Sequence, residues 1–123
     1  MNEMPIQEVR DLLAEMCGLK EDVHPANTPG LHYHLPRGGV CYVKDWQPDQ
    51  NPEFAELVKR KWVQRDGCNY LIGHTFDFNS MIARVTWNTG KVAITVDCTS
   101  VSGEESICRA IAYMYKIMKE FGE

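Results

Sequence analysis

The sequence has 123 residues, of which 44% are hydrophobic and 24% are charged; this is the composition of a folded globular protein and excludes a disordered chain. Thirteen Lys and Arg against seventeen Asp and Glu give a formal charge of −4. Because phosphate contacts supply most of the affinity of nucleic-acid-binding proteins, this balance disfavours a nucleic-acid polymer or a membrane as partner. No apolar run approaches the roughly 18 residues of a spanning helix, and the start lacks a secretory-signal layout. We therefore expect a single domain over residues 1–123 in the cytoplasm.

A first helix is predicted by apolar residues at helical spacing, which are Ile6, Val9, Leu12, Leu13 and Met16. Pro5 suits its first turn and Gly18 its end. Residues 19–39 contain three prolines and three glycines, which predicts a long loop of the kind that is often functional. A short strand is expected over 40–43.

A second helix is predicted by clearer sequence signals than the first. Asn51 is expected to cap it, Pro52 suits its first position, and four apolar residues line one face, namely Phe54, Leu57, Val58 and Trp62. Basic residues gather at its far end, Lys59, Arg60, Lys61 and Arg65. We interpret them as complementing the helix dipole.

Alternating apolar residues over 81–87 and 92–98 predict a β-hairpin. A two-residue turn at Thr89-Gly90 places the apolar side chains on one face by pairing Trp87 with Val92, Val85 with Ile94, Ala83 with Val96 and Met81 with Cys98. The other face then carries Arg84, Thr86, Thr95 and Asp97. Residues 69–78 are expected to add another strand.

A last helix is expected to start near Ser102, with Glu105 in the capping-box position. Its core stripe consists of Ile107, Ile111, Met114 and Met118, widened by Ala110, Ile117 and Phe121. The predicted fold is α+β, an antiparallel sheet covered by helices as in a small α/β/α sandwich. Further apolar residues on this helix, Cys108, Ala112 and Tyr115, predict self-association.

Two groups of residues are candidates for metal or redox sites. The five cysteines form no C-x-x-C pair, which favours free thiols in a reducing compartment. His32 and His34, with His24 upstream, have the spacing of metal ligands on one strand face but no third ligand at a recognised spacing. They are more simply surface residues or hydrogen-bond donors, and no metal or cofactor is expected. No nucleophile-elbow, P-loop or deaminase motif occurs, so nothing argues for an enzyme.

The start of the last helix is the candidate ligand site. Residues 98–103 deliver hydroxyl and backbone N–H groups to a helix N-terminus, where phosphate binds readily. Arg109, Tyr113 and Lys116 follow on the face opposite the core stripe, where a guanidinium could bind a phosphate and an aromatic ring could stack on a purine. The alternative is an exposed Glu105–Arg109 pair of little energetic weight and a surface or interface tyrosine. The candidate ligand-binding residues are Arg109, Tyr113, Thr99, Ser100 and Ser106.

Two segments carry a resemblance to known proteins: Asp45-Trp46-Gln47-Pro48 leading into residues 54–62, and the acidic turn before Ser106-Ile107-Cys108-Arg109-Ala110-Ile111. Over residues 45–118 the chain resembles small phage-encoded α/β/α sandwich domains, and among them the Thoeris anti-defence sponge proteins. The resemblance implies binding of cyclic ADP-ribose variants made by TIR-domain enzymes, without degradation. It also implies a homo-oligomer with pockets near subunit contacts, and a ligand-binding arginine at Arg109.

Three functions remain open. The first is a phage anti-defence protein that sequesters a cyclic nucleotide signal. The second is a phage hydrolase that cleaves such a signal, with chemistry from the loop that holds His32 and His34. The third is a protein–protein inhibitor or virion accessory factor.

Overall fold

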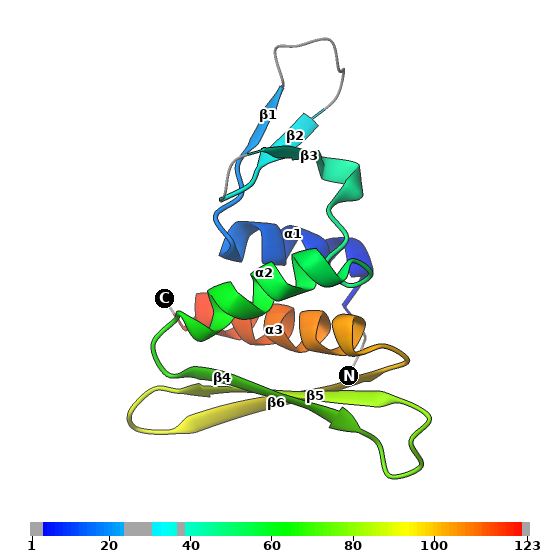
Figure 1. The fold of residues 1–123 in the computed structure, drawn as a ribbon. Helices are drawn as coiled ribbons and strands as arrows, with labels where there is room; N and C mark the ends of the chain where they lie inside the picture. Colours follow the sequence, from blue (N-terminus) through cyan, green and yellow to red (C-terminus); the bar gives the residue numbers. More distant parts are fainter. Residues whose placement is uncertain (1–3, 24–30, 37–38, 122–123) are drawn as a thin grey trace.

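Two antiparallel sheets and three α-helices account for most of the chain that the computed structural model describes, which is residues 4–23, 31–36 and 39–121 (Figure 1). In order, the elements are α1 (Ile6–Met16), β1 (Glu21–Val23), β2 (Leu31–His34), β3 (Val40–Tyr42), the 3₁₀ turn η1 (Val43–Asp45), α2 (Pro52–Val63), β4 (Cys68–His74), β5 (Met81–Asn88), β6 (Ala93–Ser100) and α3 (Gly103–Glu120). None of the described helices is long and apolar enough to cross a membrane.

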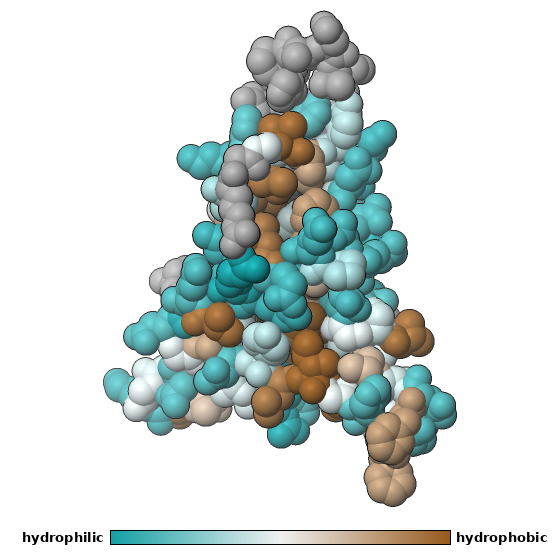
Figure 2. Space-filling model, viewed as in Figure 1, coloured by the Kyte–Doolittle hydropathy of each residue, from teal (hydrophilic) through white to brown (hydrophobic). Residues whose placement is uncertain are grey.

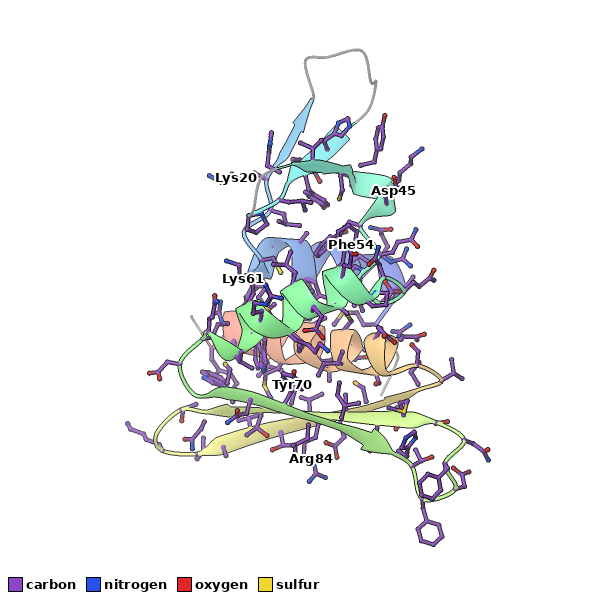
Figure 3. The ribbon with its side chains drawn as sticks, viewed as in Figure 1. Lys20, Asp45, Phe54, Lys61, Tyr70 and Arg84 are labelled. Carbon is purple, nitrogen blue, oxygen red and sulfur yellow. The ribbon has the colours of Figure 1, made fainter. Side chains whose placement is uncertain are left out.

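The larger sheet has the order β4-β5-β6, and α3 packs across it. The predicted α+β class, with helices covering an antiparallel sheet, is confirmed, but the helices cover one face of this sheet only, so an α/β/α sandwich with helices on both faces is not formed (Figure 1). All three helices lie on the same side of this sheet, so that the layers follow the order large sheet, α3, α1 with α2, and small sheet (Figure 1). Tyr70 therefore lies on the helix side of the sheet, while Arg84 projects from the uncovered face (Figure 3).

Helix α3 is the centre of the core. The sheet covers one side of it, and α1 and α2 pack against another. The side chains of Cys108 and Ala112 are fully buried within the described chain, and Tyr115 is half-buried. The surplus apolar surface, which the sequence led us to assign to another subunit, is thus occupied by the first two helices of the same chain. That reason for expecting self-association was wrong.

The β5–β6 hairpin forms, but its predicted register was wrong by two residues. Trp87 pairs with Ile94, Val85 with Val96, Ala83 with Cys98 and Met81 with Ser100. The connection is a four-residue turn over 89–92, in which the Thr89 N–H donates to the Val92 carbonyl (2.9 Å). The shift preserves which side chains share a face, but it moves Val92 out of the sheet, where its side chain is 59% exposed.

Parts of the segment over 19–39 form strands, where the sequence predicted a loop. Two strands, β1 and β2, lie within it and pair with each other, and β2 also pairs with β3 to form the small sheet. The buried ring of Tyr33 packs edge-on against Trp46 (6.2 Å between centroids). The Trp46 indole N–H in turn donates to the Arg10 carbonyl in α1 (2.9 Å). The small sheet is therefore joined to the core, and the prediction of one long loop was wrong for these strands.

The helix caps follow the predictions closely. The Asn51 side chain accepts from the N–H of Glu53 (2.9 Å), and Pro52 is the first residue of α2. Ser102 Oγ accepts from the Glu105 N–H (3.1 Å) at the start of α3. The Glu105 carboxylate binds Arg109, so the reciprocal half of the capping box is not used.

Candidate ligand site at the start of α3

The turn from β6 into α3 leaves two backbone donors available. Ser102 has extended backbone angles (φ −125°, ψ 150°) and caps the helix. Its hydroxyl accepts from the Glu105 N–H, and its carbonyl accepts from the Ser106 N–H (3.1 Å). The N–H groups of Gly103 and Glu104 have no such acceptor among the described residues. These are the orphan donors at which a helix N-terminus attracts anions.

A pocket of about 350 Å³ opens at this turn. Its walls come from four elements, α2, β4, β5 and α3, together with the turn itself. Its lining residues are Lys59, Ile72, Met81, Val101, Ser102, Gly103, Glu104 and Ile107. Apolar side chains from β4, β5 and α3 line one part, and a lysine of α2 stands beside the helix start. This combination of apolar walls with a few polar groups is typical of a small-molecule site.

The electrostatics of the pocket are balanced. Partial burial lowers the pKa of Lys59, but the hydrogen bond and the charge of Glu56 outweigh it, so that this pKa lies above its ordinary value. Lys59 is therefore cationic at neutral pH, and it is held by the Glu56 carboxylate. Glu104 brings a negative charge to the same pocket. An anionic ligand must compete with Glu56 for Lys59.

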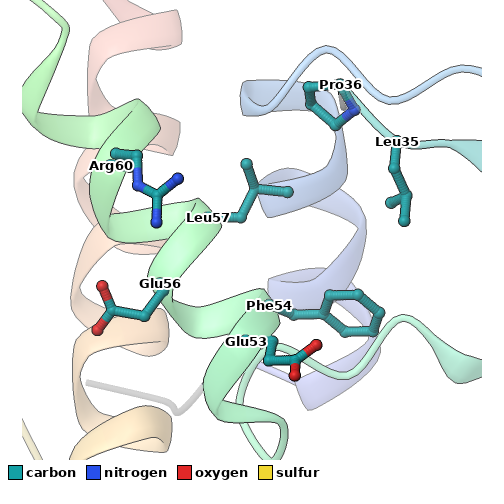
Figure 4. Close-up of a pocket in the computed structure, with 7 residues that line it drawn as sticks. All are labelled: Leu35, Pro36, Glu53, Phe54, Glu56, Leu57 and Arg60. Atoms are coloured by element: carbon teal, nitrogen blue, oxygen red, sulfur yellow. The ribbon is translucent and has the colours of Figure 1, made fainter. Parts of the chain in front are cut away.

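A second pocket of about 390 Å³ lies between α2 and the small sheet (Figure 4). Its apolar part comes from Leu35, Pro36, Phe54 and Leu57, and its charged part from Glu53, Glu56 and Arg60. Two carboxylates stand against one guanidinium here too, but the N–H groups of Glu53 and Phe54 already donate to the Asn51 side chain. This pocket therefore lacks the unbonded helix N–H donors that distinguish the start of α3.

Arg109 and Tyr113 lie together, but not on a free surface. The Arg109 guanidinium donates to the Met4 carbonyl (2.8 Å) and to the Glu105 carboxylate (2.9 Å). The Tyr113 hydroxyl accepts from the Met4 N–H (2.8 Å). The Arg109 side chain is only 12% exposed. The placement of these residues on an uncovered face, and of the Glu105–Arg109 pair in full solvent, was therefore wrong.

The same face of α3 continues with Lys116, whose ammonium group binds the Glu8 carboxylate of α1 (2.8 Å). The predicted aromatic residue flanked by cations thus contacts the N-terminal segment and α1. Its most evident role is to hold them on α3. Whether Arg109 or Tyr113 also binds a ligand stays a prediction.

The other three candidates are dispersed. Thr99 is exposed on the uncovered face of the sheet, where it pairs with Ile82, and Ser100 is half-buried on the helix side. Ser106 is fully buried, and its hydroxyl donates to the Gly103 carbonyl (3.0 Å). None of the five predicted residues lines the pocket at the start of α3. A pocket does lie at the start of α3, but other residues line it.

Sequence reasoning missed Lys59, Ile72 and Met81 as pocket residues. They come from α2, β4 and β5, and only the packing of those elements brings them to the start of α3. Strand β4 pairs with β5 so that His74 lies opposite Met81 and Ile72 lies opposite Ala83. Predicting this pairing could have placed Ile72 and Met81 near each other.

The histidines and cysteines form no metal centre among the described residues, since no group of three or more His, Cys, Asp or Glu is arranged to hold an ion. His32 is buried with its ring 4.3 Å from that of Tyr42, and His34 is exposed, so the interpretation of these histidines as surface residues was wrong for His32. His24 lies outside the described residues. All five cysteines are free thiols, and burial raises the pKa of Cys17 to about 12.

Comparison with known proteins gives no relative on which to base an assignment: no family model, no curated protein and no solved structure matches the chain.

Proposed function

We propose that this chain is a phage anti-defence protein that binds and sequesters a cyclic ADP-ribose variant in the cytosol of the infected host cell, without degrading it. The resemblance of residues 45–62 and 106–111 to sponge proteins supplies the ligand class. In this proposal the protein acts as a homo-oligomer.

The pocket at the start of α3 is the observation that carries the proposal. It offers two backbone N–H donors, one lysine and apolar walls within about 350 Å³. A cyclic ADP-ribose has a pyrophosphate and a purine, so it needs donors for the first and apolar surface for the second. The N–H groups of Gly103 and Glu104 meet the first need, and the side chains of Ile72 and Met81 meet the second.

Sequestration needs affinity and no turnover. A protein that holds the signal intact lowers its free concentration stoichiometrically, so the effect depends on the ratio of protein concentration to Kd. Because salt screens the attraction between the Lys59 cation and an anionic ligand, the affinity is expected to fall as the ionic strength rises.

Retention followed by release tests the proposal. The protein is incubated with the product of a TIR enzyme, washed and heat-denatured, and the released compound is analysed by mass spectrometry. Intact ligand in stoichiometric amount is the expected result. A chemically altered compound supports a hydrolase instead, and no retained compound contradicts binding altogether.

A matched pair of variants locates the binding. Lys59→Met removes the pocket cation and keeps the aliphatic stem, and it is expected to reduce retention at least tenfold. Lys61→Met makes the same change on the same helix at a residue that does not line the pocket, and it should retain ligand like the unmodified chain. Equal retention by both variants would place the ligand elsewhere.

A protein–protein role is favoured by one separate observation. The β4–β5 turn presents Phe76 and Phe78, which are 102% and 76% exposed, at the projecting tip at the lower right of Figures 1 and 2. The turn is held by Asp77, which accepts from the Thr75 hydroxyl (2.6 Å) and from the Asn79 N–H (3.1 Å). Phe78 adopts a positive φ of 60°, which is uncommon for a bulky residue. Two exposed rings on an ordered turn suit insertion into an apolar pocket of another protein.

A further inference from the structure

The pocket between α2 and the small sheet has an apolar floor that packing holds in place (Figure 4). Phe54 and Leu57 lie one turn apart on α2, and both are half-buried. Leu35 and Pro36 line the opposite wall. The Phe54 ring also packs against the buried Trp46, with 5.0 Å between the ring centroids. An apolar ligand would therefore meet a surface that is already formed, as is usual for small-molecule sites.

Three charged residues of α2 line the same pocket, but one of them is already bound. The Glu56 carboxylate forms an ion pair with Lys59, and in Figure 4 it points away from Leu35. The side chains of Glu53 and Arg60 form no hydrogen bond or ion pair within the described part of the chain. The pocket therefore offers a ligand one carboxylate and one guanidinium, which suits a zwitterion.

Glu53 and Arg60 stand at the two ends of the apolar floor. Arg60 follows Glu53 by seven residues, which is nearly two turns of α2, so both residues project from the same side of the helix. Their separation along the helix axis is about 10.5 Å. In Figure 4 the side chain of Leu57 lies between that of Arg60 and those of Glu53 and Phe54. A ligand that pairs with both charges must therefore be elongated and apolar between its charged ends.

The backbone of the pocket offers a ligand no further anion-binding group among the described residues. The Leu35 N–H donates to the Gly39 carbonyl (3.1 Å), and Pro36 has no N–H. The first-turn N–H groups of α2 donate to the Asn51 side chain. A carboxylate in this pocket must therefore be bound by Arg60, whose planar guanidinium can donate two parallel hydrogen bonds to it.

We propose that this pocket binds a short apolar peptide with free termini, whose ammonium group lies at Glu53 and whose carboxylate lies at Arg60. An extended chain spans about 3.3–3.6 Å per residue, so a tripeptide spans about 10–11 Å. This length matches the separation of the two charged positions, whereas a dipeptide is shorter and a pentapeptide longer. The central side chain of the tripeptide packs on Phe54 and Leu57. The site is separate from the pocket at the start of α3 and does not rest on the proposed function.

Charge fixes the direction of the peptide. Its chain runs parallel to α2, from the Glu53 end of the pocket to the Arg60 end. The reverse orientation would place the peptide carboxylate at Glu53 and its ammonium group at Arg60, where like charges repel each other.

Titration with alanyl-leucyl-alanine, followed by NMR, tests the site. We expect saturable shift changes at millimolar peptide, centred on Leu35, Phe54 and Leu57. The N-acetyl peptide and the peptide amide each lack one terminal charge, and each should bind about two- to fivefold more weakly, which is the scale of one exposed ion pair. The absence of saturable binding, shift changes confined to other residues, or equal affinity of all three peptides would overturn the proposal.

Two variants test the direction through their coupling with these peptides. Glu53→Gln should weaken binding of the free peptide about two- to fivefold but leave that of the N-acetyl peptide unchanged, since the charge that Glu53 binds is already absent. Arg60→Gln should do the same for the free peptide and the peptide amide. Both residues are exposed, so both variants should melt like the unmodified chain.

Glu104→Gln is the matched control, because this carboxylate lines the pocket at the start of α3 instead. It should bind all three peptides like the unmodified chain. Coupling of the N-acetyl group with Arg60→Gln rather than with Glu53→Gln would show the reverse orientation and overturn the proposal. Loss of affinity in Glu104→Gln equal to that in Glu53→Gln would also overturn it, because the effect would then be one of overall charge.

Discussion

Arg84 and Asp97 face each other across β5 and β6 and form two parallel hydrogen bonds, Nε to Oδ1 at 2.9 Å and Nη2 to Oδ2 at 3.1 Å. They are direct partners in the strand register. In the register predicted from the sequence, Arg84 would have opposed Thr95. The ion pair therefore favours the observed register over the predicted one. It does so on the uncovered face of the sheet, where no helix packs to fix the strand register.

The Arg84–Asp97 pair gives the first prediction. Arg84→Asp should lower the melting temperature because it sets two carboxylates opposite each other. The double variant Arg84→Asp with Asp97→Arg restores opposite charges and should recover most of the loss, as measured by thermal denaturation. The hydrogen bond from Arg84 lowers the pKa of Asp97, so the contribution of the native pair is present at neutral pH and disappears as the pH falls through that pKa. Absence of recovery in the double variant would argue against this pairing.

The second prediction contrasts two valines of the hairpin. Val85 is fully buried, while the Val92 side chain is 59% exposed. Val85→Asp should abolish cooperative folding, since an unpaired buried carboxylate costs several kcal/mol. Val92→Asp should leave the melting temperature nearly unchanged. A large loss of stability in the Val92 variant would instead support the two-residue turn.

The third prediction concerns the contacts of α3 with Met4. Arg109→Ala should destabilise the protein by about 1–3 kcal/mol, because it leaves the Met4 carbonyl and Glu105 without their buried donor. Tyr113→Phe loses one hydrogen bond and should cost about 0.5–1.5 kcal/mol. Lys116→Ala breaks an exposed pair and should have the smallest effect. Urea denaturation measures all three. If Arg109→Ala is as stable as Lys116→Ala, the contact with Met4 has no structural weight.

Local signals were sufficient for the helices. Asn51 and Pro52 define the start of α2, and Ser102 defines the start of α3, because caps depend on residues within one turn of each other. The strand register could not be settled in this way. A shift of two residues keeps every side chain on its own face, so the alternation that predicted the hairpin is equally compatible with turns of two and four residues.

The other differences arise from contacts between distant segments. Strands β1 and β2 have three and four residues, which is too short for alternation to be recognised among prolines and glycines. The apolar surface of Cys108 and Ala112 and the charged face of Arg109 both indicated a partner, but nothing local in the sequence identified that partner as α1 or as Met4. For the same reason the pocket residues from α2, β4 and β5 were not predicted.

Binding at the start of α3 is tested most directly by replacing Gly103, whose N–H is one of the two unbonded donors. Gly103→Pro removes that N–H at the first helical position, where proline is tolerated, and the extended backbone of Ser102 accepts a following proline. Gly103→Ala keeps the N–H, and its Cβ would lie 3.6 Å from Met81 Cε, an ordinary contact.

Calorimetric titration of both variants with a cyclic ADP-ribose variant, beside the unmodified chain, is the decisive measurement. A hydrogen bond to a charged phosphate contributes about 1.5–3 kcal/mol, and 1.4 kcal/mol corresponds to a tenfold change in Kd. We predict that Gly103→Pro binds at least tenfold more weakly than Gly103→Ala, while both melt like the unmodified chain. Equal affinity in the two folded variants would contradict a ligand site at the start of α3.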